Sequence, residues 1–113
     1  MEDSAKQLKD RTYAKEQAID RLEQAFGYIE RQEREPSQWE RVCLTDGFAY
    51  IFSGHYRHAT IKAMSALADK ENQLPDEKLP LDTTYNLTLV QMKEVFKQLR
   101  QAPVEIQPKF GNQ

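Results

Sequence analysis

A chain of 113 residues has room for one modest hydrophobic core and is too short for two. Its 16 basic and 18 acidic side chains leave a formal net charge of -2, so it lacks the basic excess that duplex nucleic acid attracts. No apolar run approaches the roughly 20 residues of a membrane span, and the first residues do not read as a signal peptide. With the lone cysteine Cys43 unable to form an internal disulfide, we expect a cytoplasmic protein.

The first predicted helix covers about residues 4–35. Its apolar residues recur at helical spacing and form one stripe, strongest between Ala18 and Ile29. Pro36 ends this helix, because a proline disfavours helical geometry in the residue before it. A stripe of this kind also suits a homodimer, formed through Ile19, Leu22, Phe26 and Ile29.

The second predicted helix covers about residues 37–53. Ser37 and Glu40 have the spacing of a capping box at its start. Its second half is apolar on nearly every side, which indicates that more than one neighbour covers it. Gly54 follows as a left-handed C-cap. We therefore expect this helix at the centre of the fold.

The third predicted helix, about residues 55–70, is rich in alanine and should lie close against the second helix. Two prolines and several acidic residues make residues 72–84 an irregular linker. A second capping box, Thr88 with Gln91, opens the fourth helix over about residues 89–102.

The sequence thus predicts an all-α, four-helix domain over residues 1–102. Pro103 stops the last helix, and residues 103–113 contain two prolines and little apolar content. We expect these residues to form a flexible C-terminal tail.

The centre of the chain has a pattern of small residues and tyrosines. Gly47 and Tyr50 are spaced as Gly-x-x-Tyr, and Gly54-His55-Tyr56 precedes Ala59. With these residues, residues 40–73 resemble a single tetratricopeptide repeat, a helical hairpin of 34 residues. The sequence departs from that family at Cys43, Asp46, Ala63 and Glu71, where a Trp, a Leu, an aromatic residue and a Pro are usual. The resemblance implies a tetratricopeptide-like central hairpin packed through Gly47, Gly54, Ala59, Ala66 and Leu67.

No catalytic constellation stands out, and we expect neither an enzyme nor a bound cofactor. His55 and His58 are only two potential ligands, whereas a metal site needs three or four. Cys43 lies in an apolar helix, where a buried thiol is usually inert. Asp46, a carboxylate in the same helix, should face an edge or pair with Arg57 or His58.

These observations favour a non-enzymatic protein-interaction module, a small adaptor or chaperone-like subunit. It would bind a helix or peptide on the hairpin face. The contact residues that we expect are Trp39, Tyr50, Tyr56, Arg57 and Lys62. The alternative hypothesis is a dimeric, nucleic-acid-associated regulatory protein that uses the charged N-terminal helix. Salt dependence would separate the two, because phosphate binding weakens steeply with added salt.

Overall fold

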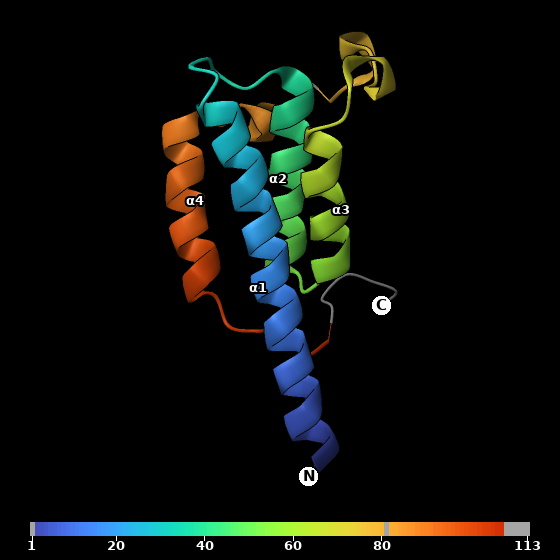
Figure 1. Ribbon diagram of the computed structural model, residues 1–113, viewed down its shortest axis with the longest axis vertical. Coiled ribbons are helices and arrows are strands. Elements are labelled where there is room, and N and C mark those ends of the chain that lie inside the picture. Colours follow the sequence, from blue (N-terminus) through green and yellow to red (C-terminus); the bar gives the residue numbers. More distant parts are fainter. Residues whose placement is uncertain (1, 81, 108–113) are drawn as a thin grey trace.

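The computed structural model describes residues 2–80 and 82–107, and this part of the chain is all-α, as predicted (Figure 1). The α-helices are α1 (Glu2–Glu30), α2 (Gln38–Phe52), α3 (Tyr56–Ala66) and α4 (Leu89–Gln101). The connection between α3 and α4 contains three short 3-10 helices, η1 (Lys70–Asn72), η2 (Asp76–Lys78) and η3 (Thr83–Tyr85). None of the helices in the described ranges combines the length and apolar character that crossing a bilayer requires.

Helix α1 runs through the middle of the bundle, with α3 on one side, α4 on the other and α2 behind (Figure 1). Successive helices run in opposite directions, and the first turns of α1 extend beyond the ends of the other helices. The apolar stripe of α1 is therefore covered by its own chain. Its four central side chains are at most 6% exposed, namely Ile19, Leu22, Phe26 and Ile29. This burial corrects the homodimer prediction, because these residues are not available to a second chain.

Both predicted capping boxes are confirmed. Ser37 caps α2, with the Glu40 side chain accepting from the Ser37 N–H, and Thr88 caps α4 with Gln91. The predicted helix ends are less accurate. Helix α1 stops at Glu30 rather than near residue 35, because the chain turns at once and Glu33 takes a positive φ of 53°.

Helix α3 is shorter than predicted, ending at Ala66 rather than near residue 70. The chain leaves the helix at Leu67, and Asp69 is already extended, with ψ near 150°. The linker predicted to be irregular has some local order, because η2 and η3 lie within it. Gly54 ends the α2 region with a positive φ of 85°, the conformation expected of a left-handed cap.

Small residues bring the helices close together. Ala59, Ala63 and Ala66 of α3 are at most 2% exposed, and Ala18 and Ala25 of α1 are fully buried. Helix α3 packs extensively on both α1 and α2, and alanine side chains allow such close approach.

The second small-residue contact joins α1 and α2. A Cβ built on Gly47 would lie 2.6 Å from Leu22 Cδ2, and the three atoms nearest to it all belong to Leu22. The glycine expected to make room for α3 within the hairpin therefore makes room for α1.

The segment after α4 is bound to the bundle. Tyr56 is buried, and its hydroxyl accepts a hydrogen bond of 2.8 Å from the Glu105 N–H. Arg11 donates to the Glu105 carbonyl at 3.0 Å and lies 4.5 Å from the Tyr56 ring centroid. Lys15 donates to the Ala102 carbonyl, and burial, together with the charge of Arg100, lowers the pKa of Lys15. Residues 103–107 of the predicted tail thus contact α1 and α3, and residues 108–113 lie outside the described residues.

We expect Tyr56→Phe to lower the free energy of unfolding by about 0.5–1.5 kcal/mol, because it removes the acceptor of the Glu105 N–H. Urea denaturation measures this change, and amide hydrogen exchange at Glu105 should become faster. Tyr13→Phe is the matched control, since Tyr13 is 65% exposed on α1. Equal stability of the two variants would show that the contact with residues 103–107 contributes nothing.

Candidate interaction surfaces

Two of the five residues predicted to contact a partner are used by the fold itself. Tyr56 is 1% exposed and holds Glu105. Trp39 is half-buried, and its Nε1 donates to the Ser65 carbonyl at 2.8 Å, which ties α2 to the last turn of α3. The buried position of Tyr56 removes it from any contact surface.

The other three predicted residues lie along the side of the α2–α3 hairpin. Arg57 is exposed, and Tyr50 is half-buried with its ring 5.2 Å from that of His58. Lys62 is half-buried, and its Nζ lies 3.5 Å from Asp46 Oδ2. The structure therefore brings together Tyr50 and the histidines, and places Lys62 with Asp46.

Asp46 does not pair with Arg57 or His58 as the sequence suggested. Instead it accepts a hydrogen bond of 2.9 Å from the hydroxyl of Tyr85, beside the ion pair with Lys62. The hydrogen bond to Asp46 and burial raise the pKa of Tyr85. Asp46 thus fastens η3 to α2, a contact between residues 39 positions apart.

The histidine pair forms part of a ring cluster. The rings of His55 and His58 are 5.7 Å apart, and Tyr50 lies 6.0 Å from His55. Ser53 Oγ and His55 Nδ1 are in hydrogen-bond contact at 3.0 Å. Within the described residues no three potential metal ligands lie close enough together to hold an ion. Cys43 is 2% exposed, and burial raises the pKa of its thiol to about 11, which suppresses the reactive thiolate.

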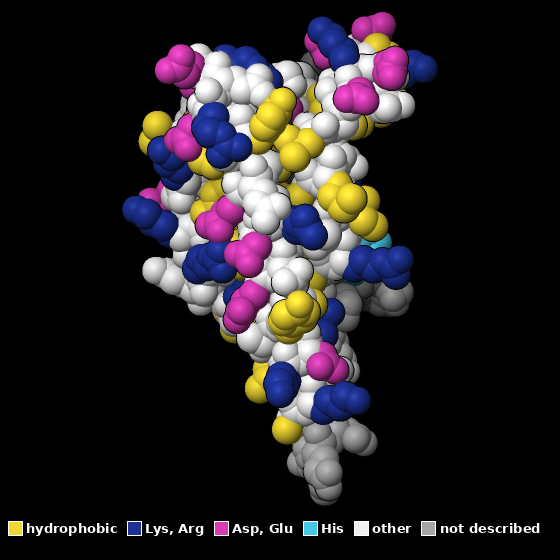
Figure 2. Space-filling view, viewed as in Figure 1, with side chains coloured by type: hydrophobic (Ala, Val, Ile, Leu, Met, Phe, Trp, Pro, Cys, Tyr) yellow, Lys and Arg dark blue, Asp and Glu magenta, His cyan; other side chains and the backbone are white. Residues whose placement is uncertain are grey.

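A set of large apolar side chains is exposed along the outer side of α3 and the adjoining part of α1. Ile61, Met64 and Leu67 are 51%, 64% and 45% exposed, and Tyr28 of α1 is 49% exposed. Tyr28 and Leu67 line the same surface depression, and the three α3 residues follow at intervals of three. Figure 2 shows hydrophobic side chains gathered over this part of the molecule. We call these four residues the α3 face.

Leu67 belongs to this face and not to the hairpin contact in which the sequence placed it. It follows the end of α3 at Ala66, and the turn directs it away from α2. Sequence reasoning also missed Ile61 and Met64, although a helical projection could have found them. Tyr56, Ala59, Ala63 and Ala66 share one side of α3, so that Ile61 and Met64 fall on other sides.

Arginines flank the α3 face. Arg57 lies one helical turn before Ile61, and Arg21 lies two turns before Tyr28 on α1. Both are exposed, and neither belongs to an ion pair within the described part of the chain. The surface beside the apolar residues is therefore positively charged.

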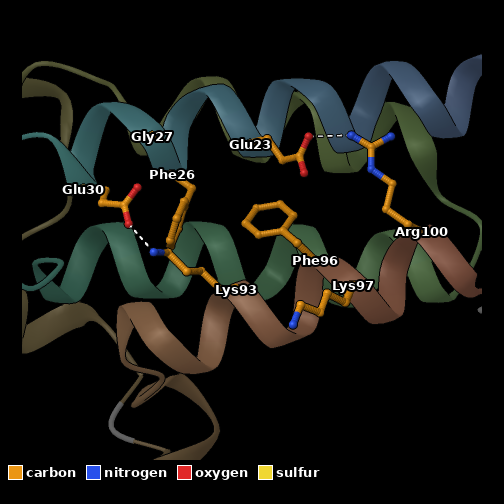
Figure 3. Close-up of a pocket in the computed structure, with 8 residues that line it drawn as sticks. All are labelled: Glu23, Phe26, Gly27, Glu30, Lys93, Phe96, Lys97 and Arg100. Atoms are coloured by element: carbon orange, nitrogen blue, oxygen red, sulfur yellow. Dashed lines mark hydrogen bonds and ion pairs between the residues drawn. The ribbon is translucent and has the colours of Figure 1, made fainter.

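A groove between α1 and α4 is the second concave surface, on the other flank of α1 (Figure 3). Its volume is about 410 Å³, and Phe26 and Phe96 lie at its floor. The two rings meet edge to face with their centroids 5.4 Å apart. Ion pairs between the helices border the groove.

Comparison of the chain with protein-family models, with curated proteins and with solved structures found no match. The functional argument therefore rests on these surfaces.

Proposed function

We propose that this protein is a non-enzymatic interaction module that docks an amphipathic helix of a partner protein on the α3 face. The observation that carries the proposal is the joint exposure of Tyr28, Ile61, Met64 and Leu67. Soluble proteins rarely leave several large apolar side chains together in water, and such patches usually mark interaction sites. The α3 alanines already supply the buried side of the helix, so the exposed side chains are not needed by the core.

The spacing and the charges of the α3 face define the partner. Apolar residues three apart on a helix match a second helix whose own apolar residues recur at three and four positions. Arg21 and Arg57 favour acidic residues at the edges of that helix, which speed association and orient it. Methionine adapts its shape to different apolar partners, so Met64 is suited to the centre of the contact.

The nucleic-acid alternative has less support. It relies on the charged start of α1, yet Arg11 donates to the carbonyls of Gly54 and Glu105, and Lys15 donates to that of Ala102. These basic groups are engaged within the chain. Exposed acidic residues on the same helix, such as Glu16 and Asp20, also repel phosphate.

We expect Met64→Glu to abolish capture of the partner without unfolding the protein. Met64 is 64% exposed, so the unfolding free energy should change by less than about 0.5 kcal/mol, as for most surface substitutions. A charge at the centre of an apolar contact should weaken binding at least about tenfold. Quantitative affinity capture from the native cell, followed by mass spectrometry, measures the loss.

Val90→Glu is the matched control, because Val90 is an apolar residue of α4 and 77% exposed. Partners of the α3 face should be retained by this variant and lost with Met64→Glu. Equal recovery of every captured protein by the two variants would contradict the proposal.

A further inference from the structure

Two ion pairs cross from α1 to α4. Lys93 Nζ lies 2.7 Å from Glu30 Oε2, and Arg100 pairs with Glu23 (Figure 3). The two glutamates are seven residues apart on α1, and the two cations are seven apart on α4. Because the helices are antiparallel, the pairs form a regular ladder with one ion pair at each end of the groove.

The ladder is interrupted in its middle. Lys97 lies between Lys93 and Arg100 on α4, and Gly27 occupies the corresponding level of α1, between the two glutamates (Figure 3). A glycine offers no carboxylate. The ion pair that Lys97 forms is with Glu94 of its own helix, at 3.9 Å and with both side chains exposed. Lys97 therefore differs from its neighbours in having no acidic partner on α1.

The fold does not require a glycine at position 27. Gly54 is the glycine with a positive φ among the described residues, and Gly27 lies inside α1. A Cβ built on Gly27 would meet Arg31 Nη1 at 3.5 Å, an ordinary contact. Glycine inside a helix destabilises it relative to alanine. What the missing side chain does provide is open space above the rings of Phe26 and Phe96 and a cation without a cross-helix carboxylate.

We propose that the α1–α4 groove is a second binding site, for a partner peptide that carries a carboxylate one helical turn from an aliphatic side chain. The aliphatic group contacts the edges of Phe26 and Phe96, and the carboxylate pairs with Lys97, completing the ladder. This site is independent of the α3 face, which lies on the other flank of α1. A protein with both sites could hold two partners at once.

The test is a titration of the ¹⁵N-labelled protein with short helical peptides, followed by amide chemical shifts. The probe is a capped, alanine-based peptide with one leucine and one glutamate four residues apart. It should cause saturable shifts in residues 23–30 and 93–100. Peptides with Gln for Glu, or Ala for Leu, should bind at least about threefold more weakly, the effect of losing one exposed ion pair or a small apolar contact.

Variants of the protein separate this site from the α3 face. Gly27→Leu should fill the groove and abolish the shifts while melting no lower than the wild type, and Lys97→Gln should weaken binding about threefold. Met64→Glu should leave this binding unchanged. The proposal is overturned if no saturable shifts appear at millimolar peptide, or if Gly27→Leu binds the probe normally. Hexanoate binding as tightly as the peptide would overturn the peptide assignment in favour of a free carboxylate.

Discussion

Replacing Gly47 with leucine should lower the free energy of unfolding by about 2–3 kcal/mol, the upper part of the usual range for overpacking a core. Even a single Cβ at this position would lie 2.6 Å from Leu22 Cδ2. Leu22 is fully buried, so its side chain has little space into which to move. The gain in helix propensity, roughly 0.8 kcal/mol for leucine over glycine, offsets only part of the cost. Chemical denaturation measures the difference.

Gly27→Leu is the control, because it places the same residue at another glycine inside a helix. Position 27 is open, so this variant should be neutral or more stable than the wild type. Leu22→Ala combined with Gly47→Leu should recover part of the loss, since the two side chains compete for one space. If Gly47→Leu were as stable as Gly27→Leu, the contact between α1 and α2 would be wrong.

Phe96→Ala should have the largest effect, a loss of about 3–5 kcal/mol in the free energy of unfolding. The Phe96 ring meets Phe26 at 5.4 Å and Phe48 at 5.2 Å, both edge to face. It therefore joins α4 to both α1 and α2. The loss is a large share of the stability of a small domain, typically about 5–15 kcal/mol.

Phe52→Ala is the comparison for this variant, because Phe52 is 39% exposed at the end of α2. It should cost much less in the same denaturation experiment. Equal losses from the two variants would show that α4 does not depend on the ring cluster.

The helices could be predicted because their signals are local. The capping residues Ser37 and Thr88 and the proline after α1 act within one helical turn. Gly47 shows where this reasoning ends. A glycine inside a helix indicates that something approaches closely, but not which helix does so. The hairpin pattern pointed to α3, and the structure places Leu22 of α1 there.

The apolar stripe of α1 shows the same limitation for partners. A stripe through Ile19 and Phe26 requires burial, and the sequence does not distinguish burial in the same chain from burial in a dimer. In the structure α2, α3 and α4 provide the cover. The contact between Asp46 and Tyr85 was not predictable for another reason: it joins α2 to a linker without periodicity.

The candidate surfaces were only partly accessible from the sequence. Among the residues expected to contact a partner, Arg57 flanks the α3 face, whereas Tyr56 is buried. The hairpin of α2 and α3 occupies the predicted place, and its resemblance to a tetratricopeptide repeat stays a prediction.

The α3 face is tested most directly by titrating the ¹⁵N-labelled protein with an acidic amphipathic helical peptide. The peptide should carry leucines at intervals of three and four and glutamates along both edges. We expect the largest amide shifts at Tyr28, Ile61, Met64 and Leu67, and their loss in the Met64→Glu variant. Shifts confined to α2 or α4, or none at millimolar peptide, would contradict the proposed function.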